Sequence, residues 1–193
     1  MTKRTAADER DTIIDDFKNA AWQDDVDIID ELAVRHPWLV DPAQPYLLHA
    51  LHAACGSCQQ NSAQLLVEKY HADVNKLADG MNALHQAMNS ADMVTAKMLI
   101  RNGADINMPT QTTDGFVDGW SPLHFAISHR DTEMTLFLLN HGADPLAKEK
   151  EGLDAANFAR KAGRADLAVI IDKHAFTGAK PQTALKREPR PKI

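Results

Sequence analysis

The apolar and polar positions of residues 80–107 predict two short helices joined by a polar turn at 89–92. Residues spaced three and four apart lie on one face of a helix. The apolar faces would hold Leu84, Ala87 and Met88 in the first helix, and Thr95, Met98 and Leu99 in the second. Gly103 follows where a helix ends in a left-handed residue, a conformation that glycine adopts without steric cost. Two helices this short cannot bury an apolar face alone, so the pattern indicates a unit that packs against neighbours.

The same pattern recurs along the chain with a period of 33 residues. The glycines that open a unit at 80, 119 and 152 are 39 and 33 residues apart, so six extra residues precede Trp120. Upstream, residues 50–54 match residues 83–87, and the segment 17–29 fits one further unit. A fixed period of this length is typical of repeat proteins, in which each unit buries its apolar face on its neighbours.

These units resemble the repeats of the ankyrin repeat family. The resemblance rests on Ser-Pro-Leu-His-Phe-Ala at 121–126, on Asn-Ala-Leu-His-Gln-Ala at 82–87, and on Gly-Ala-Asp at 103–105 and 142–144. The ankyrin repeat has about 33 residues and carries Thr-Pro-Leu-His-x-Ala near its start. The resemblance implies an all-α solenoid of about five helix–turn–helix units, with hairpin tips along one edge and a long tip before the fourth unit.

The boundaries of this solenoid can be estimated from the pattern. We expect residues 1–10 to be a frayed N-terminus, residues 11–174 to form a single ankyrin-repeat domain, and residues 175–193 to be a disordered basic tail. The helices expected in the first two units are 11–21, 25–34, 48–56 and 60–70. In the second unit, Tyr70-His71 replaces the single glycine that ends the second helix elsewhere.

The net charge of −6 conceals an uneven distribution along the chain. Residues 180–193 carry five bases and one acid, a net +4, so the rest of the chain carries about −10. The first 36 residues hold ten acids against five bases. An acidic array of this kind repels phosphate backbones and is steered towards a basic protein surface. The alternative is a solubility charge on an end unit, which must face water in any repeat array.

The sequence contains no run of about 18 apolar residues, and its first ten residues have no apolar signal core. Its 44% apolar content is sufficient for one packed core. We therefore expect a cytoplasmic protein that binds no membrane and is a monomer on its own.

One histidine recurs at the same repeat position, as His52, His85 and His124. The resemblance implies that its ring bonds to the backbone of the adjoining hairpin and ties successive units together. This role needs a neutral ring with one donor and one acceptor.

His49, His52, Cys55 and Cys58 are each three residues apart, and their side chains suit zinc or redox chemistry. Steps of three residues drift by about 60° around a helix, so the four converge only if the helix breaks at Gly56. A metal or redox sensor at His49, Cys55 and Cys58 is thus the alternative to two reduced structural thiols. Two cysteines are too few for a disulfide scaffold.

Asp118, Ser121 and His124 have the residue types of a catalytic triad. Ser121, however, stands at a helix-capping position that is Asn82 or Asp154 in sister units. The sequence has no glycine-rich phosphate loop and no His-Glu-x-x-His motif. We therefore expect no enzyme activity, no catalytic residue, no metal and no cofactor.

The resemblance implies a partner-binding face built from the ends of the first helices and the hairpin tips. The matching helix-end positions are Trp22, Gln23, Gly56, Ser57, Asn89, Ser90, Ser128, His129, Lys161 and Ala162. The matching hairpin positions are Leu77, Asp79, Met81, Phe116, Asp118, Trp120, Lys148, Lys150, Glu151 and Leu153. Such a mixed aromatic and polar surface suits a protein partner better than nucleic acid or lipid. Phe116 and Trp120, in the long tip, would either anchor that partner or fold back onto the local core.

Together these features favour a non-enzymatic binding module that recognises one basic protein and blocks or scaffolds it. An inhibitor, a toxin-neutralising immunity protein and an adaptor in a regulatory complex are all compatible with the sequence. The basic tail also allows a contact with nucleic acid outside the repeats. If Trp120 is an anchor, Trp120→Ala should weaken partner binding and leave the melting temperature little changed.

Overall fold

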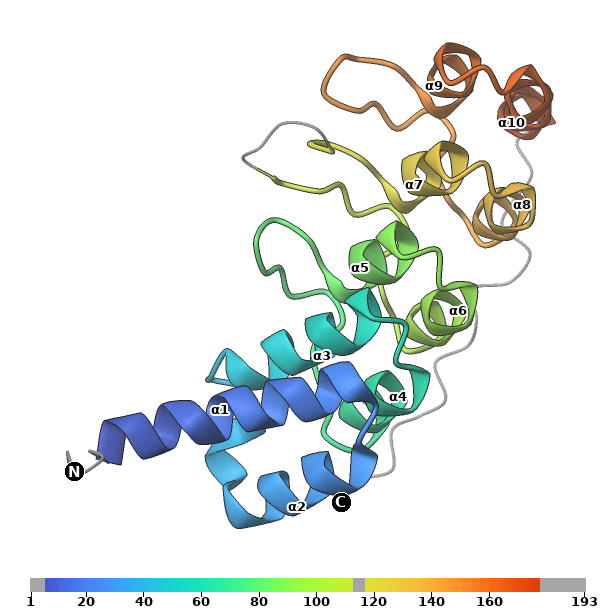
Figure 1. Ribbon diagram of the computed structural model, residues 1–193. Coiled ribbons are helices and arrows are strands. Elements are labelled where there is room, and N and C mark those ends of the chain that lie inside the picture. Colours follow the sequence, from blue (N-terminus) through green and yellow to red (C-terminus); the bar gives the residue numbers. More distant parts are fainter. Residues whose placement is uncertain (1–5, 113–116, 178–193) are drawn as a thin grey trace.

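The computed structural model describes residues 6–112 and 117–177, and within them ten α-helices stack as five pairs (Figure 1). The pairs are α1 (Ala6–Gln23) with α2 (Val26–Arg35), α3 (Tyr46–Gly56) with α4 (Gln60–Glu68), α5 (Ala83–Asn89) with α6 (Met93–Arg101), α7 (Pro122–Ser128) with α8 (Thr132–Asn140), and α9 (Ala155–Lys161) with α10 (Ala165–Thr177). A 3-10 helix, η1 (Pro37–Leu39), connects the first pair to the second. The first helices form one layer, the second helices form another, and the hairpin loops project beside the first helices (Figure 1). The predicted all-α solenoid is confirmed.

The hairpin of the third unit turns on a left-handed glycine. Ala78 and Met81 exchange two backbone hydrogen bonds of 2.8 and 3.0 Å. Between them, Asp79 and Gly80 have φ angles of 50° and 76°, and positive φ at both central residues is characteristic of a type I′ turn. The next hairpin packs directly on this turn, because the Gln111 N–H donates to the Gly80 carbonyl at 2.8 Å.

The turn between the two helices of each unit also contains a left-handed residue. The five residues at this position are Asp24, Cys58, Ala91, Arg130 and Gly163. The same turn conformation therefore occurs in all five units, including the first and the fifth, whose sequences match the repeat least. His71, with a φ of 57°, takes the left-handed position that Gly103 and Gly142 occupy after α6 and α8.

The core lies between the two helix layers and consists mainly of small aliphatic side chains. Leu51, Leu84 and Leu123, each immediately before the repeated histidine, are fully buried. Burial of one such side chain contributes roughly 1.5–3 kcal/mol, which is large against the marginal stability of a folded domain. The predicted apolar faces of α5 and α6 are also buried, except that Met98 is only partly covered.

Asparagines join successive units through the turns that follow the second helices. The Asn75 side chain donates to the Gly103 carbonyl at 2.9 Å and accepts from the Asp105 N–H at 2.7 Å. Asn107 makes the same two bonds to the next unit, at 3.0 and 2.8 Å. Leu146 occupies this position in the fourth unit and is 64% exposed, because α10 continues where the earlier second helices turn.

The fifth unit presents a polar face to the end of the stack. In the fourth unit, Ile127 of α7 and Leu139 of α8 are buried. The same repeat positions in the fifth unit are Arg160 of α9 and Asp172 of α10, which form an ion pair with both side chains about half exposed. Burying this pair beneath a sixth unit would be costly, so α9 and α10 act as a cap.

Two helix boundaries differ from the expected positions. Helix α1 starts at Ala6 and not at residue 11, because Asp8 and Glu9 stand in its first turn, where acidic side chains favour a helix start. Residues 6–10 are therefore helical and not frayed. Helix α10 runs to Thr177, beyond the domain end expected at residue 174. Residues 1–5, which were expected to be frayed, and residues 178–193 of the expected tail lie outside the described residues.

Candidate functional site

In the third unit, the repeated histidine has the structural role that the sequence predicted. His85 Nδ1 accepts from the Asn82 N–H at 3.1 Å, so its Nε2 carries the proton and donates to the Met108 carbonyl at 2.8 Å. The Asn82 side chain in turn accepts from the His85 N–H, which completes a capping box at the start of α5. Through Met108, the ring ties the third unit to the loop that leads into the fourth.

Burial keeps these rings neutral. It lowers the pKa of His52 and of His85 to about 4, and the effect outweighs the opposing influence of the Lys76 and Met108 backbone groups. Burial also lowers the pKa of His124. A neutral ring with one donor and one acceptor is what the connection between units requires.

The structure does not bring the Cys/His group together as a metal or redox site. Cys55 is fully buried and burial raises the pKa of its thiol, so it stays protonated, whereas a metal ligand or nucleophile must be a thiolate. Cys58 is exposed, and its Sγ lies 3.7 Å from the Ser90 carbonyl of the next unit. Among residues 6–112 and 117–177, no three His, Cys, Asp or Glu side chains are grouped as metal ligands. The sensor alternative at His49, Cys55 and Cys58 therefore has no geometric support.

The triad reading fails for a different reason. Ser121 Oγ lies 2.9 Å from His124 Nδ1, but both residues are buried and together form the capping box of α7. Asp118 points elsewhere, since its carboxylate lies 3.5 Å from Lys150 Nζ. A substrate cannot reach a hydroxyl that is covered in this way.

The predicted binding residues fall into two rows. The hairpin row consists of Leu77, Asp79, Met81, Asp118, Lys148, Lys150, Glu151 and Leu153, all exposed or half-buried. The helix-end row consists of Trp22, Gln23, Gly56, Ser57, Asn89, Ser90, Ser128, His129, Lys161 and Ala162, also exposed or half-buried. A seven-residue first helix is about 10 Å long, which sets the separation of the two rows.

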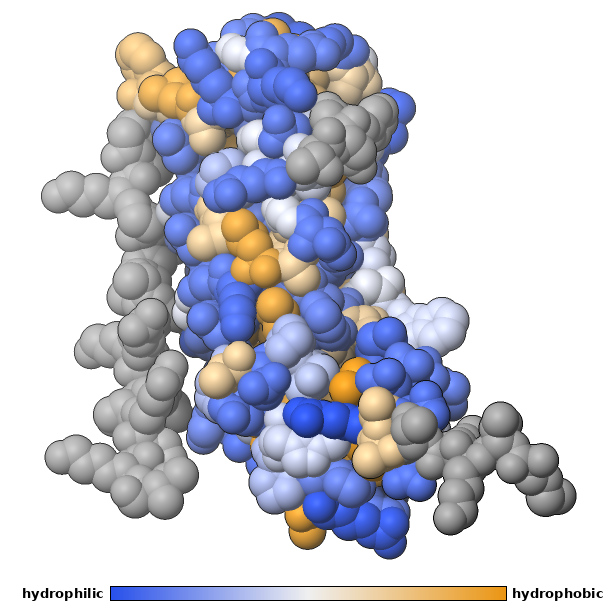
Figure 2. Space-filling model, turned by 90° about the vertical axis from the view of Figure 1, so that its left-hand side faces the viewer, coloured by the Kyte–Doolittle hydropathy of each residue, from blue (hydrophilic) through white to orange (hydrophobic). Residues whose placement is uncertain are grey.

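A half-buried side chain of α5 connects the two rows. Gln86 Nε2 lies 4.0 Å from Met81 Sδ in the hairpin row. Its Oε1 lies 3.6 Å from the point where a Cβ on Gly56 would stand, in the helix-end row. Figure 2 looks onto the hairpin side of the molecule and shows apolar side chains gathered among hydrophilic ones there. The rows and the first helices between them thus form one mixed surface.

Trp120 does not belong to this surface. Its side chain is 8% exposed, and its ring packs edge-on against Phe125 at 5.2 Å and Phe158 at 5.1 Å between ring centroids. Of the two alternatives for Trp120, the burial therefore agrees with folding back onto the local core and contradicts the anchor, because the hairpin after the long insertion packs on the next unit. Phe116, the other aromatic residue of that tip, lies outside the described residues.

Several charged and polar side chains of the two rows already have partners within the chain. Lys150 pairs with Asp118, Glu151 pairs with Lys161, and the Ser90 hydroxyl donates to the Gly56 carbonyl at 2.8 Å. Exposed pairs of this kind contribute little to stability, so they can exchange for a partner's charges at small cost. The void beside His129 is only about 10 Å³, room for a single water, and is no ligand pocket.

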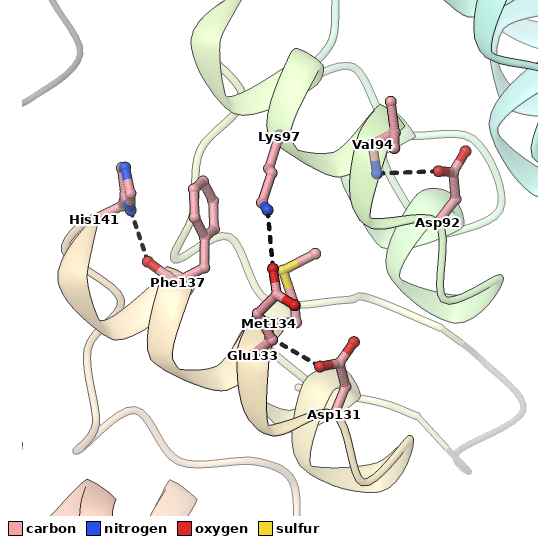
Figure 3. Close-up of polar contacts among 8 residues, drawn as sticks. All are labelled: Asp92, Val94, Lys97, Asp131, Glu133, Met134, Phe137 and His141. Atoms are coloured by element: carbon pink, nitrogen blue, oxygen red, sulfur yellow. Dashed lines mark hydrogen bonds and ion pairs between the residues drawn. The ribbon is translucent and has the colours of Figure 1, made fainter.

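The opposite layer, formed by the second helices, is occupied by contacts between units (Figure 3). Lys97 of α6 reaches across to α8, where its Nζ lies 3.3 Å from Glu133 Oε1 and 5.1 Å from the centroid of the Phe137 ring. The Phe137 ring stacks on His141, with centroids 3.9 Å apart. These side chains join two units, so the surface formed by the two rows is the better candidate for binding.

Comparison with known proteins agrees with this architecture. The family model for ankyrin repeats, which describes three copies, matches residues 17–110, 51–149 and 92–180. The chain belongs to the ankyrin repeat family. Ankyrin repeats are protein-binding modules and are typically without enzyme activity of their own. None of the described helices of this ankyrin-repeat chain is long and apolar enough to cross a bilayer.

Similar regions occur in several longer proteins. Protein phosphatase 1 regulatory subunit 27 of Mus musculus is 36% identical over 73 residues, which are 38% of this chain and 44% of that protein. RelA-associated inhibitor of Mus musculus is 38% identical over 65 residues, 34% of this chain and 7% of the relative. SMC5-SMC6 complex localization factor protein 1 of Bos taurus is 32% identical over 102 residues, 52% of this chain and 9% of the relative. This chain thus spans less than half the length of each of these relatives.

Proposed function

We propose that this chain binds one protein with a basic surface through its hairpin row and helix-end row, and that it blocks or scaffolds that protein. In this proposal the chain acts as a cytoplasmic monomer without enzyme activity, and its repeats contact neither nucleic acid nor membrane. An inhibitor or immunity protein is one form of this activity, and an adaptor in a regulatory complex is the other.

The observation that carries the proposal is the exposure of apolar side chains on an otherwise polar surface. Trp22 is 58% exposed at the end of α1, Leu77 and Met81 are half-buried in the hairpin of the third unit, and Leu153 is half-buried in the hairpin of the fifth unit. Tryptophan is enriched among the residues that dominate interface energies. A set of such side chains over several units suits an extended protein partner better than a small molecule, which needs an enclosing pocket.

The charge of the first unit supports a basic partner. Residues 6–35 carry ten acidic side chains and three basic ones, and Trp22 lies within this segment. Opposite charge at the edge of an interface raises the association rate more than the affinity, and salt screens the effect. Binding should therefore weaken as salt rises.

The test is capture of partner proteins from source-cell extract on the immobilised full-length chain, at about 50 mM and about 300 mM NaCl. Trp22→Ala should reduce capture by at least about tenfold, as the loss of an interface anchor predicts. Val34→Ala is the matched control, because Val34 is 72% exposed but lies on α2 in the second-helix layer. An activity assay of the captured protein with and without the chain then separates a blocker from a scaffold.

Equal capture by the wild type, the Trp22 variant and the Val34 variant would show that the two rows are not the interface. Capture of acidic proteins only, unaffected by salt, would contradict the basic partner.

A further inference from the structure

An open groove lies at the N-terminal end of the stack, outside the contacts between repeat units. Helix α1 has 18 residues, against 7 in α5, α7 and α9, and its first turns project beyond the stack (Figure 1). Beside them runs the connection that contains η1. The open groove between the two has a volume of about 400 Å³ and is lined by Ala6, Glu9, Arg10, Ile13, His36 and Trp38.

One cationic side chain of the chain itself, that of Arg10, already contacts the Trp38 ring in this groove. The guanidinium carbon of Arg10 lies 4.5 Å from the centroid of the Trp38 ring, within the range of a cation–π contact. Tyr46 packs edge-on against the Trp38 ring, with ring centroids 5.5 Å apart, and the His36 ring lies 5.9 Å from it. These neighbours hold the indole in place, so its face is preformed for a planar cation.

The contact made by Arg10 is displaceable. Arg10 is exposed on α1, and cation–π contacts at exposed sites are weak. No salt bridge is found for Arg10 within the described residues, whereas Lys18 on the same helix pairs with Asp15 at 3.4 Å. Glu9 lines the groove next to it, so a carboxylate is available to an incoming guanidinium.

The charge of the surrounding residues determines whether the groove favours a positively or a negatively charged ligand. The ten acids of residues 6–35 outnumber the three bases, so the field at the groove favours a second cation and opposes an anion, despite Arg10 itself. Of the cationic side chains, arginine fits best, because its planar guanidinium stacks on an indole face and also binds a carboxylate through two N–H groups.

We propose that this groove takes an arginine side chain of the protein partner, which displaces Arg10 from the face of Trp38 and pairs with Glu9. The inference rests on the proposed function, since it specifies one contact made by the basic partner. It adds a site that neither the hairpin row nor the helix-end row contains.

The test uses the tripeptide acetyl-Gly-Arg-Gly-amide, titrated into the full-length chain while the indole N–H signals of its three tryptophans are followed by NMR. The Trp38 signal, assigned with Trp38→Phe, should shift and saturate, and the signals of Trp22 and Trp120 should not. Acetyl-Gly-Glu-Gly-amide should leave all three unchanged. A shift with the glutamate peptide, or none with the arginine peptide, would overturn the proposal.

Arg10→Gln gives the sharper comparison. It removes the internal competitor, so the arginine peptide should bind about two- to fivefold more tightly, the factor that an exposed cation–π contact represents. Lys18→Gln, which removes the same charge from the same helix away from the groove, should change the affinity by clearly less. If Arg10→Gln binds the arginine peptide more weakly than the wild type, Arg10 serves to recruit an anion. If Arg10→Gln and Lys18→Gln gain the same affinity for the peptide, the gain is a general effect of net charge. Either result would refute an arginine site.

Other occupants of the groove give distinct results. If neutralising Lys186, Arg187, Arg190 and Lys192 in the full-length chain shifts the Trp38 signal without peptide, the chain's own tail fills the groove and the proposal is wrong. A Trp38 shift that depends on protein concentration would mean a second copy, with the same consequence. Partner capture unaffected by Arg10→Gln and Trp38→Phe would reject the groove and leave the proposed function standing. Saturable peptide binding without any captured partner would reject the proposed function instead.

Discussion

Two glycines with the same turn conformation should differ in how much a methyl group costs. Gly80 and Gly152 have φ angles of 76° and 82°, so alanine is strained by about 1 kcal/mol at either position. A Cβ on Gly80 would stand 2.2 Å from the Gln111 carbonyl oxygen, whereas nothing lies within 4 Å of one on Gly152. Gly80→Ala should therefore lower the free energy of unfolding by at least about 2 kcal/mol more than Gly152→Ala in urea titration. Equal losses would mean that the hairpins are not in contact.

The burial of Trp120 makes its side chain part of the core, which was one of the two alternatives left open by its sequence position. Trp120→Ala removes a ring packed on Phe125 and Phe158, and should lower the free energy of unfolding by about 3–5 kcal/mol. Trp22→Ala, at a 58% exposed position, should change it by less than about 0.5 kcal/mol. Thermal and urea unfolding of both variants measure this difference. A Trp120 variant as stable as wild type would restore the anchor role.

The residues that were misjudged share a physical cause. The sequence pattern correctly identified the repeated histidine of the third unit, the buried leucine before it and the capping positions, because all three belong to the motif that recurs with the 33-residue period. The position of Trp120 depends on the path of a hairpin after a six-residue insertion, which interrupts the period. The left-handed conformations of Cys58, Ala91 and Arg130 were also missed, since only glycine signals that conformation in a sequence.

Among the helices, the last pair determines where the stack ends. Replacing Arg160 by Ile and Asp172 by Leu copies the apolar pair of the fourth unit onto the end face. The double variant should self-associate, and light scattering after size-exclusion chromatography would show dimers or larger species at micromolar concentration. Glu31→Leu with Arg35→Ile, which removes an exposed ion pair from α2, should leave the chain monomeric. A monomeric Arg160/Asp172 variant would show that the ion pair does not limit stacking.

Helices α1 and α10 extend further than the repeat pattern predicts. The 33-residue pattern locates the unit but not how far a terminal helix extends beyond it. Helix α1 begins 11 residues before Phe17, where the repeat pattern of the first unit starts, and its first turns are set by Asp8 and Glu9. The groove beside Trp38 depends on this extension, so the repeat pattern gave no signal for it. A tryptophan after a helix-ending His-Pro pair was the only local sign.

For the molecule as a whole, the buried histidines make stability depend on pH. The pKa of His52 and His85 falls from its usual value near 6.5 to about 4 on folding. Between these values the unfolded chain takes up protons that the folded chain does not, so stability is greatest above pH 6.5 and declines towards pH 4. At about 1.4 kcal/mol per pKa unit, the two residues together account for a loss on the order of 7 kcal/mol.

Urea titrations at about pH 7, 5.5 and 4.5 measure this decline. His85→Asn should flatten it, because one of the responsible rings is gone, while replacing the exposed His129 by Asn should not. The same slope in all three proteins would assign the decline to carboxylates. No decline would show that the rings are charged inside the folded chain.

The two thiols of the chain differ in a way that is useful in the laboratory. Cys55 is covered and protonated, while Cys58 stands at the surface in the turn between α3 and α4, directly after Ser57 of the helix-end row. A maleimide dye should therefore attach at one position of the unmodified chain. Its emission would then report the arrival of a partner in real time, with no engineered cysteine to disturb the binding surface.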